Sequence, residues 1–195
     1  MRRPLATVIG AGGNGTVLTP ALMDQAEAVG RCAVTAGFDV VTGGYEGVMC
    51  AAARGCRIGG GRAIGILRGH DTGEGNTSLD YALPTGVGLA RNVQTVLAAD
   101  VVVALDGGRG TLEEILFALD HERPVLAWPY WTWLLQAPYP FCAVTLQYVD
   151  VPGDQRLVRD LEEFGGHHGR RTTTAASGDG GEVESADQAD GHGVG

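Results

Sequence analysis

An arginine and two glutamates beside glycine-rich turns are the side chains in this sequence best suited to chemistry. Glu113 and Glu114 follow the turn Asp106-Gly-Gly-Arg-Gly-Thr111. Arg91 belongs to the segment Gly88-Leu-Ala-Arg-Asn92. A carboxylate can stabilise the positive charge that develops on a sugar when its glycosidic bond breaks, and a guanidinium can hold a phosphate through two parallel hydrogen bonds. We therefore take Arg91, Glu114 and Glu113 as candidate catalytic residues.

Each of these side chains also has a purely structural explanation. The spacing Thr111-x-x-Glu114 fits a capping box, in which the two side chains satisfy the first amides of a helix. Acidic residues in a first helical turn, where the sequence places Glu113 and Glu114, also favour the helix electrostatically. Arg91 could be a solvated surface arginine. The two roles of Glu114, cap and catalyst, stay open and can coexist.

Three glycine-rich turns each follow an expected strand and precede an expected helix, near residues 10–15, 43–47 and 107–110. In a parallel sheet these turns lie at the same edge, where open α/β sheets bind ligands. Glycine lets the backbone approach a ligand closely, and free amides at a helix N-terminus favour phosphate. We expect the phosphate and the rest of the ligand to be bound by Gly12, Gly13, Gly43, Gly44, Gly47, Thr85, Gly107, Gly108, Arg109, Gly110 and Thr111.

The first turn also satisfies the spacing GxGxxG, with Gly10, Gly12 and Gly15. A dinucleotide site would need a helix that begins within these glycines and an acidic residue at the end of the second strand. The best helix start is instead Thr19-Pro20, which combines a capping side chain with proline at the first helical position. Thr42-Gly43 stands where the acidic residue would be. Hydride transfer to a dinucleotide is therefore disfavoured.

Apolar runs alternate with helical patterns along most of the chain, which is typical of a parallel sheet with crossover helices. The expected strands are 5–9, 39–42, 62–67, 79–83, 100–105, 124–128 and, at an edge, 141–148. Helices are expected at 19–37, from the second glycine turn to 54, and at 89–99, 107–122 and 154–164. The sequence thus predicts an α/β, Rossmann-like, doubly wound parallel sheet of six to seven strands with helices on both faces. We expect residues 1–164 to form one domain and the acidic, Gly-rich stretch 165–195 to be a disordered tail.

Composition excludes several classes of protein. The 195 residues carry a net charge of −9, so a basic nucleic-acid surface is not expected. No lysine occurs, which excludes a Schiff-base enzyme and a P-loop lysine. The four cysteines show no CxxC spacing and indicate free thiols; no metal site is expected. No apolar run reaches membrane-spanning length, and we expect a cytoplasmic protein without membrane contact.

Four segments in order resemble the Lonely Guy-like superfamily of Rossmann-type proteins, which includes cytokinin-activating phosphoribohydrolases and molybdenum cofactor carrier proteins. They are Gly43-Gly-Tyr-Glu-Gly-Val-Met49, Ile64-Gly-Ile-Leu-Arg-Gly-His-Asp71, Pro84-Thr-Gly-Val-Gly-Leu-Ala-Arg-Asn92 and Gly107-Gly-Arg-Gly-Thr-Leu-Glu-Glu114. The chain departs from the hydrolases at Asp106, where they usually have proline, and at Asn92, where they have lysine. Its Ala90-Arg-Asn92 form and its Gly69-His-Asp71 loop look closer to the carrier and uncharacterised bacterial branch.

The resemblance implies a small phosphorylated ligand and a homodimer. Under the first hypothesis the ligand is a nucleoside 5′-monophosphate, which Arg91 and Glu114, with Glu113, would cleave to base and ribose 5-phosphate without a cofactor. Under the alternative the protein is a non-catalytic carrier or storage protein for a phosphorylated pterin such as the molybdenum cofactor. A nucleotide-sensing regulator is a third possibility. The sequence leaves enzyme and carrier open.

Overall fold

A parallel sheet of seven strands forms the centre of the computed structural model, which describes residues 2–12, 17–128, 131, 146–148 and 155–168. Among these residues the strand order is β4-β3-β2-β1-β5-β6-β7, and every neighbouring pair is parallel. The strands are β1 (Leu5–Ile9), β2 (Asp39–Thr42), β3 (Ala63–Leu67), β4 (Tyr81–Pro84), β5 (Val101–Ala104), β6 (Val125–Ala127) and β7 (Leu146–Tyr148). This confirms the predicted α/β fold.

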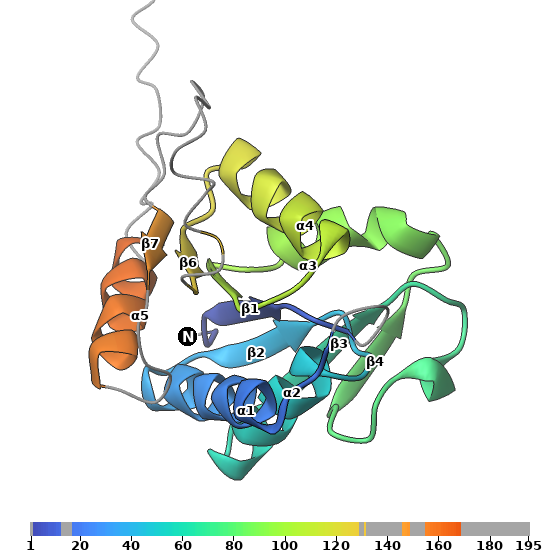
Figure 1. Cartoon of the computed structure of the whole chain (residues 1–195), viewed down its shortest axis with the longest axis horizontal. Coiled ribbons are helices and arrows are strands. Elements are labelled where there is room, and N and C mark those ends of the chain that lie inside the picture. The colour runs from blue at the N-terminus through green and yellow to red at the C-terminus, as the bar shows by residue number, and fades with distance from the viewer. Residues whose placement is uncertain (1, 13–16, 129–130, 132–145, 149–154, 169–195) are drawn as a thin grey trace, which may run out of the picture.

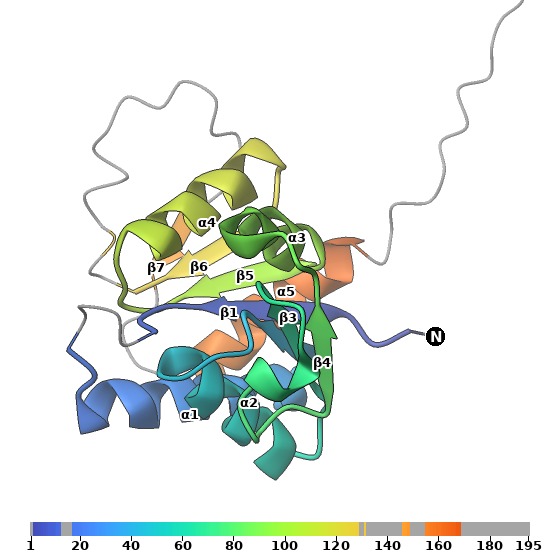
Figure 2. The same ribbon diagram turned by 90° about the vertical axis from the view of Figure 1, so that its right-hand side faces the viewer.

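Helices cover both faces of the sheet (Figures 1 and 2). Helices α1 (Pro20–Thr35), α2 (Val48–Ile58) and α5 (Gln155–His168) pack on one face, and α3 (Arg91–Leu97) and α4 (Arg109–Asp120) on the other. Two 3-10 turns, η1 (Thr72–Glu74) and η2 (Gly88–Ala90), flank β4. Because both faces are covered, the central strands are mostly apolar, and β5 is apolar and buried at every position.

Several elements begin where the sequence indicated. The side chain of Thr19 accepts a hydrogen bond from the Leu22 amide and caps α1, and Pro20 occupies its first position. The first helix therefore starts well after the glycines of the first turn, as predicted. The region expected to be one helix at 89–99 is instead a 3-10 turn followed by the short helix α3. Gly86 and Gly88, both with positive φ, delay the regular helix until Arg91.

The C-terminal boundary also differs from the prediction. Helix α5 continues to His168, so residues 165–168 are helical and do not belong to the predicted tail. Residues 169–195 lie outside the described part of the chain. The predicted edge strand 141–148 is described only at Leu146–Tyr148, where it pairs with β6 at the sheet edge.

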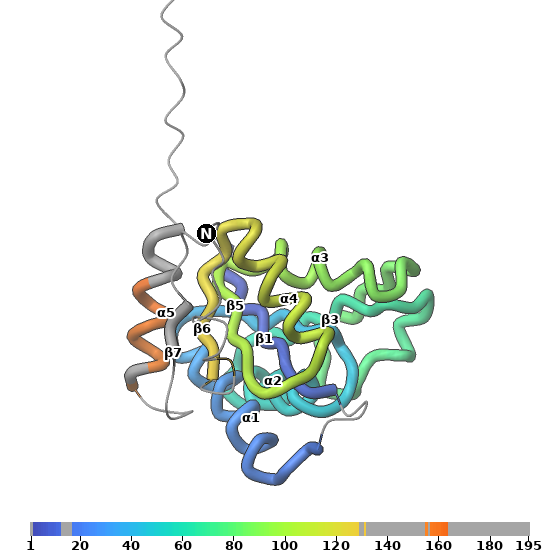
Figure 3. The backbone as a smooth tube through the Cα atoms, turned by 45° about the horizontal axis from the view of Figure 1, so that its top comes forward, coloured from blue at the N-terminus to red at the C-terminus, as the bar shows by residue number. Residues whose placement is uncertain are grey.

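The order of the strands decides where a ligand can bind. The chain builds outward from β1 to β4 on one side and then returns to β5 on the other, so the topology reverses between β1 and β5. Figure 3 shows β1 running between α2 and α4. In open parallel sheets a crevice forms at such a reversal, outside the carboxyl ends of the strands. The three glycine-rich turns follow β1, β2 and β5 and therefore meet at this crevice.

Candidate functional site

A cavity of about 690 Å³ lies at the carboxyl ends of β1, β2, β3 and β5. This volume is within the ~300–1,000 Å³ that small-molecule sites usually occupy. The cavity draws its walls from all three glycine-rich turns and from the loops after β3 and β4. It is lined by Gly10, Ala11, Gly12, Tyr45, Glu46, Met49, Arg68, Leu89, Arg91, Asn92, Gly108, Arg109, Gly110, Thr111, Glu113 and Glu114.

The N-terminus of α4 supplies the wall best suited to an anion. Gly108 is its N-cap residue, and no side chain caps the helix there. The amides of Arg109, Gly110 and Thr111 therefore begin the helix without the usual capping acceptor. Together with the positive end of the helix dipole and the exposed Arg109 side chain, these amides give this wall a positive potential that suits an anion.

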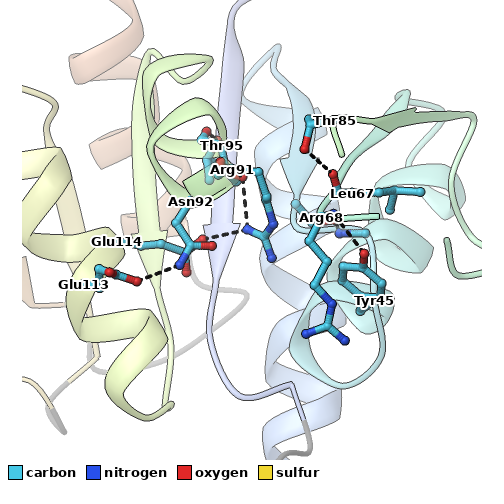
Figure 4. A network of polar contacts seen from close by, with 12 residues as sticks. Tyr45, Leu67, Arg68, Thr85, Arg91, Asn92, Thr95, Glu113 and Glu114 are labelled. Atoms are coloured by element: carbon cyan, nitrogen blue, oxygen red, sulfur yellow. Dashed lines mark hydrogen bonds and ion pairs between the residues drawn. The ribbon is translucent and has the colours of Figure 1, made fainter. Parts of the chain in front are cut away.

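Arg91 and Glu114 form a buried ion pair in the cavity (Figure 4). Arg91 Nη1 lies 3.1 Å from Glu114 Oε1 and also donates to the Thr95 hydroxyl at 3.1 Å. Only 8% of the Arg91 side chain and 10% of the Glu114 side chain are exposed. Arg91 Nε is buried without a hydrogen-bond partner among the described residues. Since a buried guanidinium donor is costly to leave unpaired, this nitrogen is a donor that a ligand oxygen could satisfy.

Burial also changes the acidity of Glu114. Removal from water raises the pKa of this carboxyl to about 7, although the nearby Arg91 charge and hydrogen bond act to lower it. The charge on Glu113 adds a smaller upward effect. A carboxyl with a pKa near neutrality is common in binding and catalytic sites, where it can lose or gain a proton at working pH. Glu114 is therefore chemically as well as geometrically distinct from an exposed glutamate.

The predicted capping box at Thr111 and Glu114 is wrong. Helix α4 begins two residues before Thr111, so Thr111 is already in its first turn and Glu113 and Glu114 lie in its second. Glu114 instead pairs with Arg91, and Glu113 Oε2 accepts a hydrogen bond of 2.9 Å from Asn92 Nδ2. Two side chains of α3 thus bind two successive side chains of α4, which fixes the two helices against each other at the cavity.

The glycines of the second turn lie behind the cavity wall and have local structural roles. A side chain at Gly43 would overlap the guanidinium of Arg91 and the sulfur of Met49, so this glycine makes room for the ion pair. Gly44 and Gly47 both have positive φ, which other residues rarely adopt. Gly47 is the N-cap of α2.

Two other predicted ligand residues, Thr85 and Gly107, do not line the cavity. The hydroxyl of Thr85 donates to the Leu67 carbonyl at 2.8 Å and so ties the loop after β4 to the end of β3. Gly107 is buried, and a side chain there would overlap Thr111. Gly13 lies outside the described residues. Of the predicted ligand set, Gly12, Gly108, Arg109, Gly110 and Thr111 line the cavity, as do the three candidate catalytic residues.

Sequence reasoning missed the wall formed by Tyr45 and Arg68. The guanidinium carbon of Arg68 lies 4.7 Å from the centre of the Tyr45 ring, a cation–π contact. The Tyr45 hydroxyl accepts from the Arg68 amide at 2.9 Å and donates to Glu74 at 3.2 Å. Both residues occurred in the quoted motif segments, but only the fold shows that the ends of β2 and β3 bring them together.

Among the described residues, no group of three or more histidine, cysteine or acidic side chains is arranged to hold a metal ion. Within the same residues, none of the helices combines the length and the apolar character that a membrane crossing requires.

The amino-acid sequence is similar to a known protein family and to a protein from another organism. Residues 3–139 match the model of the SLOG cluster4 family. An uncharacterized protein from Archaeoglobus fulgidus is 37% identical over 98 residues, which are 50% of this chain and 64% of that relative. The match therefore spans less than two thirds of that relative.

Solved structures of similar fold include two that concern the molybdenum cofactor. The molybdenum cofactor binding protein from Rippkaea orientalis is 31% identical, with a TM-score of 0.72 over 84% of this chain and 97% of that one. The molybdenum cofactor carrier protein from Chlamydomonas reinhardtii is 28% identical, with a TM-score of 0.69 over 82% and 98%. DNA processing protein A from Streptococcus pneumoniae, at 17% identity and a TM-score of 0.61 over 81% and 61%, shares the fold alone.

Proposed function

The chain belongs to the SLOG cluster4 family, and on that premise we propose that it binds a phosphorylated pterin such as the molybdenum cofactor as a carrier or storage protein. The predicted resemblance to this superfamily, with its lean toward the carrier branch, is confirmed. The observation that carries the proposal is the uncapped N-terminus of α4 inside the 690 Å³ cavity. It supplies amides and a cationic side chain for the phosphate, while the rest of the cavity has room for a ring system.

The residues present fit such a ligand at both ends. Arg109 and the first amides of α4 would hold the phosphate, and the half-buried Tyr45 and Met49 would contact the flat pterin. The bound cofactor would supply its own redox chemistry. The protein's contribution is to orient the phosphate, surround the ring and limit its contact with water.

Copurification tests the carrier function directly. The protein is expressed in cells that make the molybdenum cofactor, purified, and denatured under oxidising conditions, and the released pterin is measured by fluorescence. We expect pterin in proportion to protein, and at least tenfold less from a Gly108→Asp variant, whose carboxylate occupies the anion site. Equal traces of pterin from both proteins, with no protection of added cofactor from oxidation, would reject the proposal.

The buried Arg91–Glu114 pair favours a second candidate function, hydrolysis of nucleoside 5′-monophosphates. Water would attack the C1′ carbon of the ribose as the N-glycosidic bond breaks. The electron pair of that bond would leave with the base. Water would lose a proton and the base would gain one. The ionised Glu114 would stabilise the positive sugar in the transition state, and Arg91 would orient the carboxylate.

Release of free base from a panel of monophosphates tests this second function. Because ionised Glu114 is needed and its pKa is about 7, activity should rise as the pH increases through 7. Glu114→Gln should abolish the release while leaving ligand binding measurable. A panel without any base release would exclude the hydrolase and leave the carrier proposal intact.

We also propose that the protein is a cytoplasmic homodimer. Apolar side chains support an interface at the free edge of the sheet, where Tyr81 and Leu83 of β4 and the nearby Val87 and Leu89 are all about half exposed or more. Such a cluster is unusual on a monomer's surface. Sedimentation equilibrium should give twice the chain mass, and Leu83→Glu should give the monomer.

A further inference from the structure

Arg68 and Tyr45 form a stacked pair on the opposite wall of the cavity from the α4 N-terminus. Arg68 follows β3, whereas α4 follows β5. In the strand order β3-β2-β1-β5, three strand spacings separate these positions, about 14 Å at ~4.8 Å per spacing. A ligand whose phosphate sits at α4 and that extends across these strand ends would present its heterocycle to Arg68.

The backbone of Arg68 is held on both sides. Its amide donates to the Tyr45 hydroxyl at 2.9 Å, and its carbonyl accepts from the Gly88 amide at 2.9 Å. The guanidinium then lies over the Tyr45 ring, as Figure 4 shows. Among the described residues the guanidinium has no ion pair or hydrogen bond to a protein acceptor. Its backbone and the Tyr45 hydroxyl, by contrast, all have hydrogen-bond partners. Arg68 is thus an exposed arginine whose backbone is anchored and whose guanidinium, at the cavity wall, is available to a ligand.

We propose that Arg68, stacked on Tyr45, is a specificity-determining residue that selects ligands with an oxo group beside a ring-nitrogen acceptor. This inference rests on the proposed function of the cavity and names the class of heterocycle that it accepts. A planar guanidinium can donate two parallel hydrogen bonds to such an edge, as arginine does to O6 and N7 of guanine. A fully oxidised 4-oxopterin presents the same pair of acceptors at O4 and N5, whereas in a tetrahydropterin N5 carries a hydrogen and O4 is the remaining acceptor of the pair. An adenine edge presents an amino donor in place of the oxo group, and a guanidinium, which has no acceptor, cannot pair with it.

Matched ligand pairs test this selectivity by titration calorimetry. One pair is inosine 5′-monophosphate and adenosine 5′-monophosphate, which differ in the oxo or amino group. The other is a phosphorylated, fully oxidised pterin and its 4-amino analogue. In whichever pair binds, we expect the oxo member to bind at least about tenfold more tightly than the amino member. The pair that binds more tightly identifies the ring system.

Three variants separate edge recognition from simple charge attraction. Arg68→Gln should remove the preference by weakening the oxo member alone, and Arg68→Lys should keep the positive charge but also lose most of the preference. Arg109→Gln, on the phosphate side, should weaken both members of a pair equally. Arg57→Gln, an exposed arginine outside the cavity, should change neither.

The outcomes of this experiment are distinct. If the wild type binds oxo and amino ligands equally, or if Arg68→Gln weakens both equally, the role of Arg68 is overturned while the phosphorylated-ligand site stands. If neither pair binds at all, both the proposed function and the role of Arg68 fail. A preference in the wild type that disappears in both Arg68 variants supports the inference.

Discussion

At the scale of single residues, the buried Glu114 carboxyl couples the site to the stability of the fold. Its pKa is raised from a usual 4.5 to about 7 by burial, against the opposing effect of Arg91. The folded protein therefore binds a proton more tightly than the unfolded chain does. The free energy of unfolding should be highest below pH 4.5 as far as Glu114 is concerned, and should fall as the pH rises to about 7.

Glu114→Gln should flatten this part of the pH profile, because the amide keeps an acceptor for Arg91 but does not titrate. The wild type should lose on the order of 1–3 kcal/mol between pH 5 and pH 8 that the variant does not lose. Urea unfolding at a series of pH values measures the difference. Glu113→Gln, an exposed neighbour on the same helix, is the matched control. If the free energy of unfolding depended on pH in the same way in the two variants, the pH dependence would not come from Glu114.

Gly43 is a second residue whose role is set by its neighbours. A methyl group there would overlap the Arg91 guanidinium and Met49, so Gly43→Ala should destabilise the fold by about 1–3 kcal/mol and displace the ion pair. Gly110→Ala is the control for stability, because a side chain at Gly110 meets no atom within 4 Å and alanine favours a helix. Denaturant unfolding of both proteins tests this. Equal stabilities would show that the Gly43 turn can move aside.

The sequence was enough to identify several residues of the site, but not the residues that each of them contacts. Arg91, Glu113 and Glu114 were found because charged side chains next to glycine turns at one sheet edge are unusual. That Glu114 pairs with Arg91 depends on how α3 packs against α4, which local spacing does not encode. Arg68 could not be assigned, because its contact with Tyr45 joins the ends of two different strands.

At the scale of elements, most strands were predictable because buried parallel strands are continuous apolar runs. Helix starts depended on the capping signal. Thr19-Pro20 was identified correctly, whereas the cap of α4 was assigned to Thr111 because a threonine followed three residues later by a glutamate imitates a capping box. The actual N-cap is Gly108, which has no side chain. An element that starts without a capping side chain leaves amides available for a ligand, so the misassigned cap coincides with the candidate site.

This uncapped start predicts opposite effects on folding and binding. Gly108→Asp and Gly108→Asn should both stabilise α4 by a few tenths of a kcal/mol or more, because either side chain caps the helix. Only the aspartate adds negative charge at the anion site, so it should weaken binding of a phosphorylated ligand at least about tenfold more than asparagine does. Thermal unfolding and calorimetry measure the two effects. Equal affinities for both variants would place the phosphate elsewhere.

At the scale of the whole molecule, the cavity joins the two halves of the doubly wound sheet. Gly12, Tyr45 and Arg68 belong to the half built from β1 to β4, and Arg109 and Glu114 to the half that begins with β5. The core cluster on the face covered by α1, α2 and α5 contains strand residues of both halves, for example Val40 of β2 and Val101 of β5. A ligand that contacts both halves should therefore stabilise the domain as one unit and not only a local loop.

The shift in melting temperature follows from the linkage of binding to folding. A ligand at about 100 times its dissociation constant stabilises the folded state by about 2.7 kcal/mol. For a domain of this size that corresponds to a rise in Tm of about 5–11 °C. We expect this rise with inosine 5′-monophosphate or a phosphorylated pterin, as a single transition seen equally by tryptophan fluorescence and by circular dichroism. Inosine, which lacks the phosphate, should give little shift at the same concentration because it leaves the α4 amides unpaired. A shift of equal size with inosine would mean that ring contacts alone hold the ligand, whereas two separate transitions would mean that the halves of the sheet unfold independently.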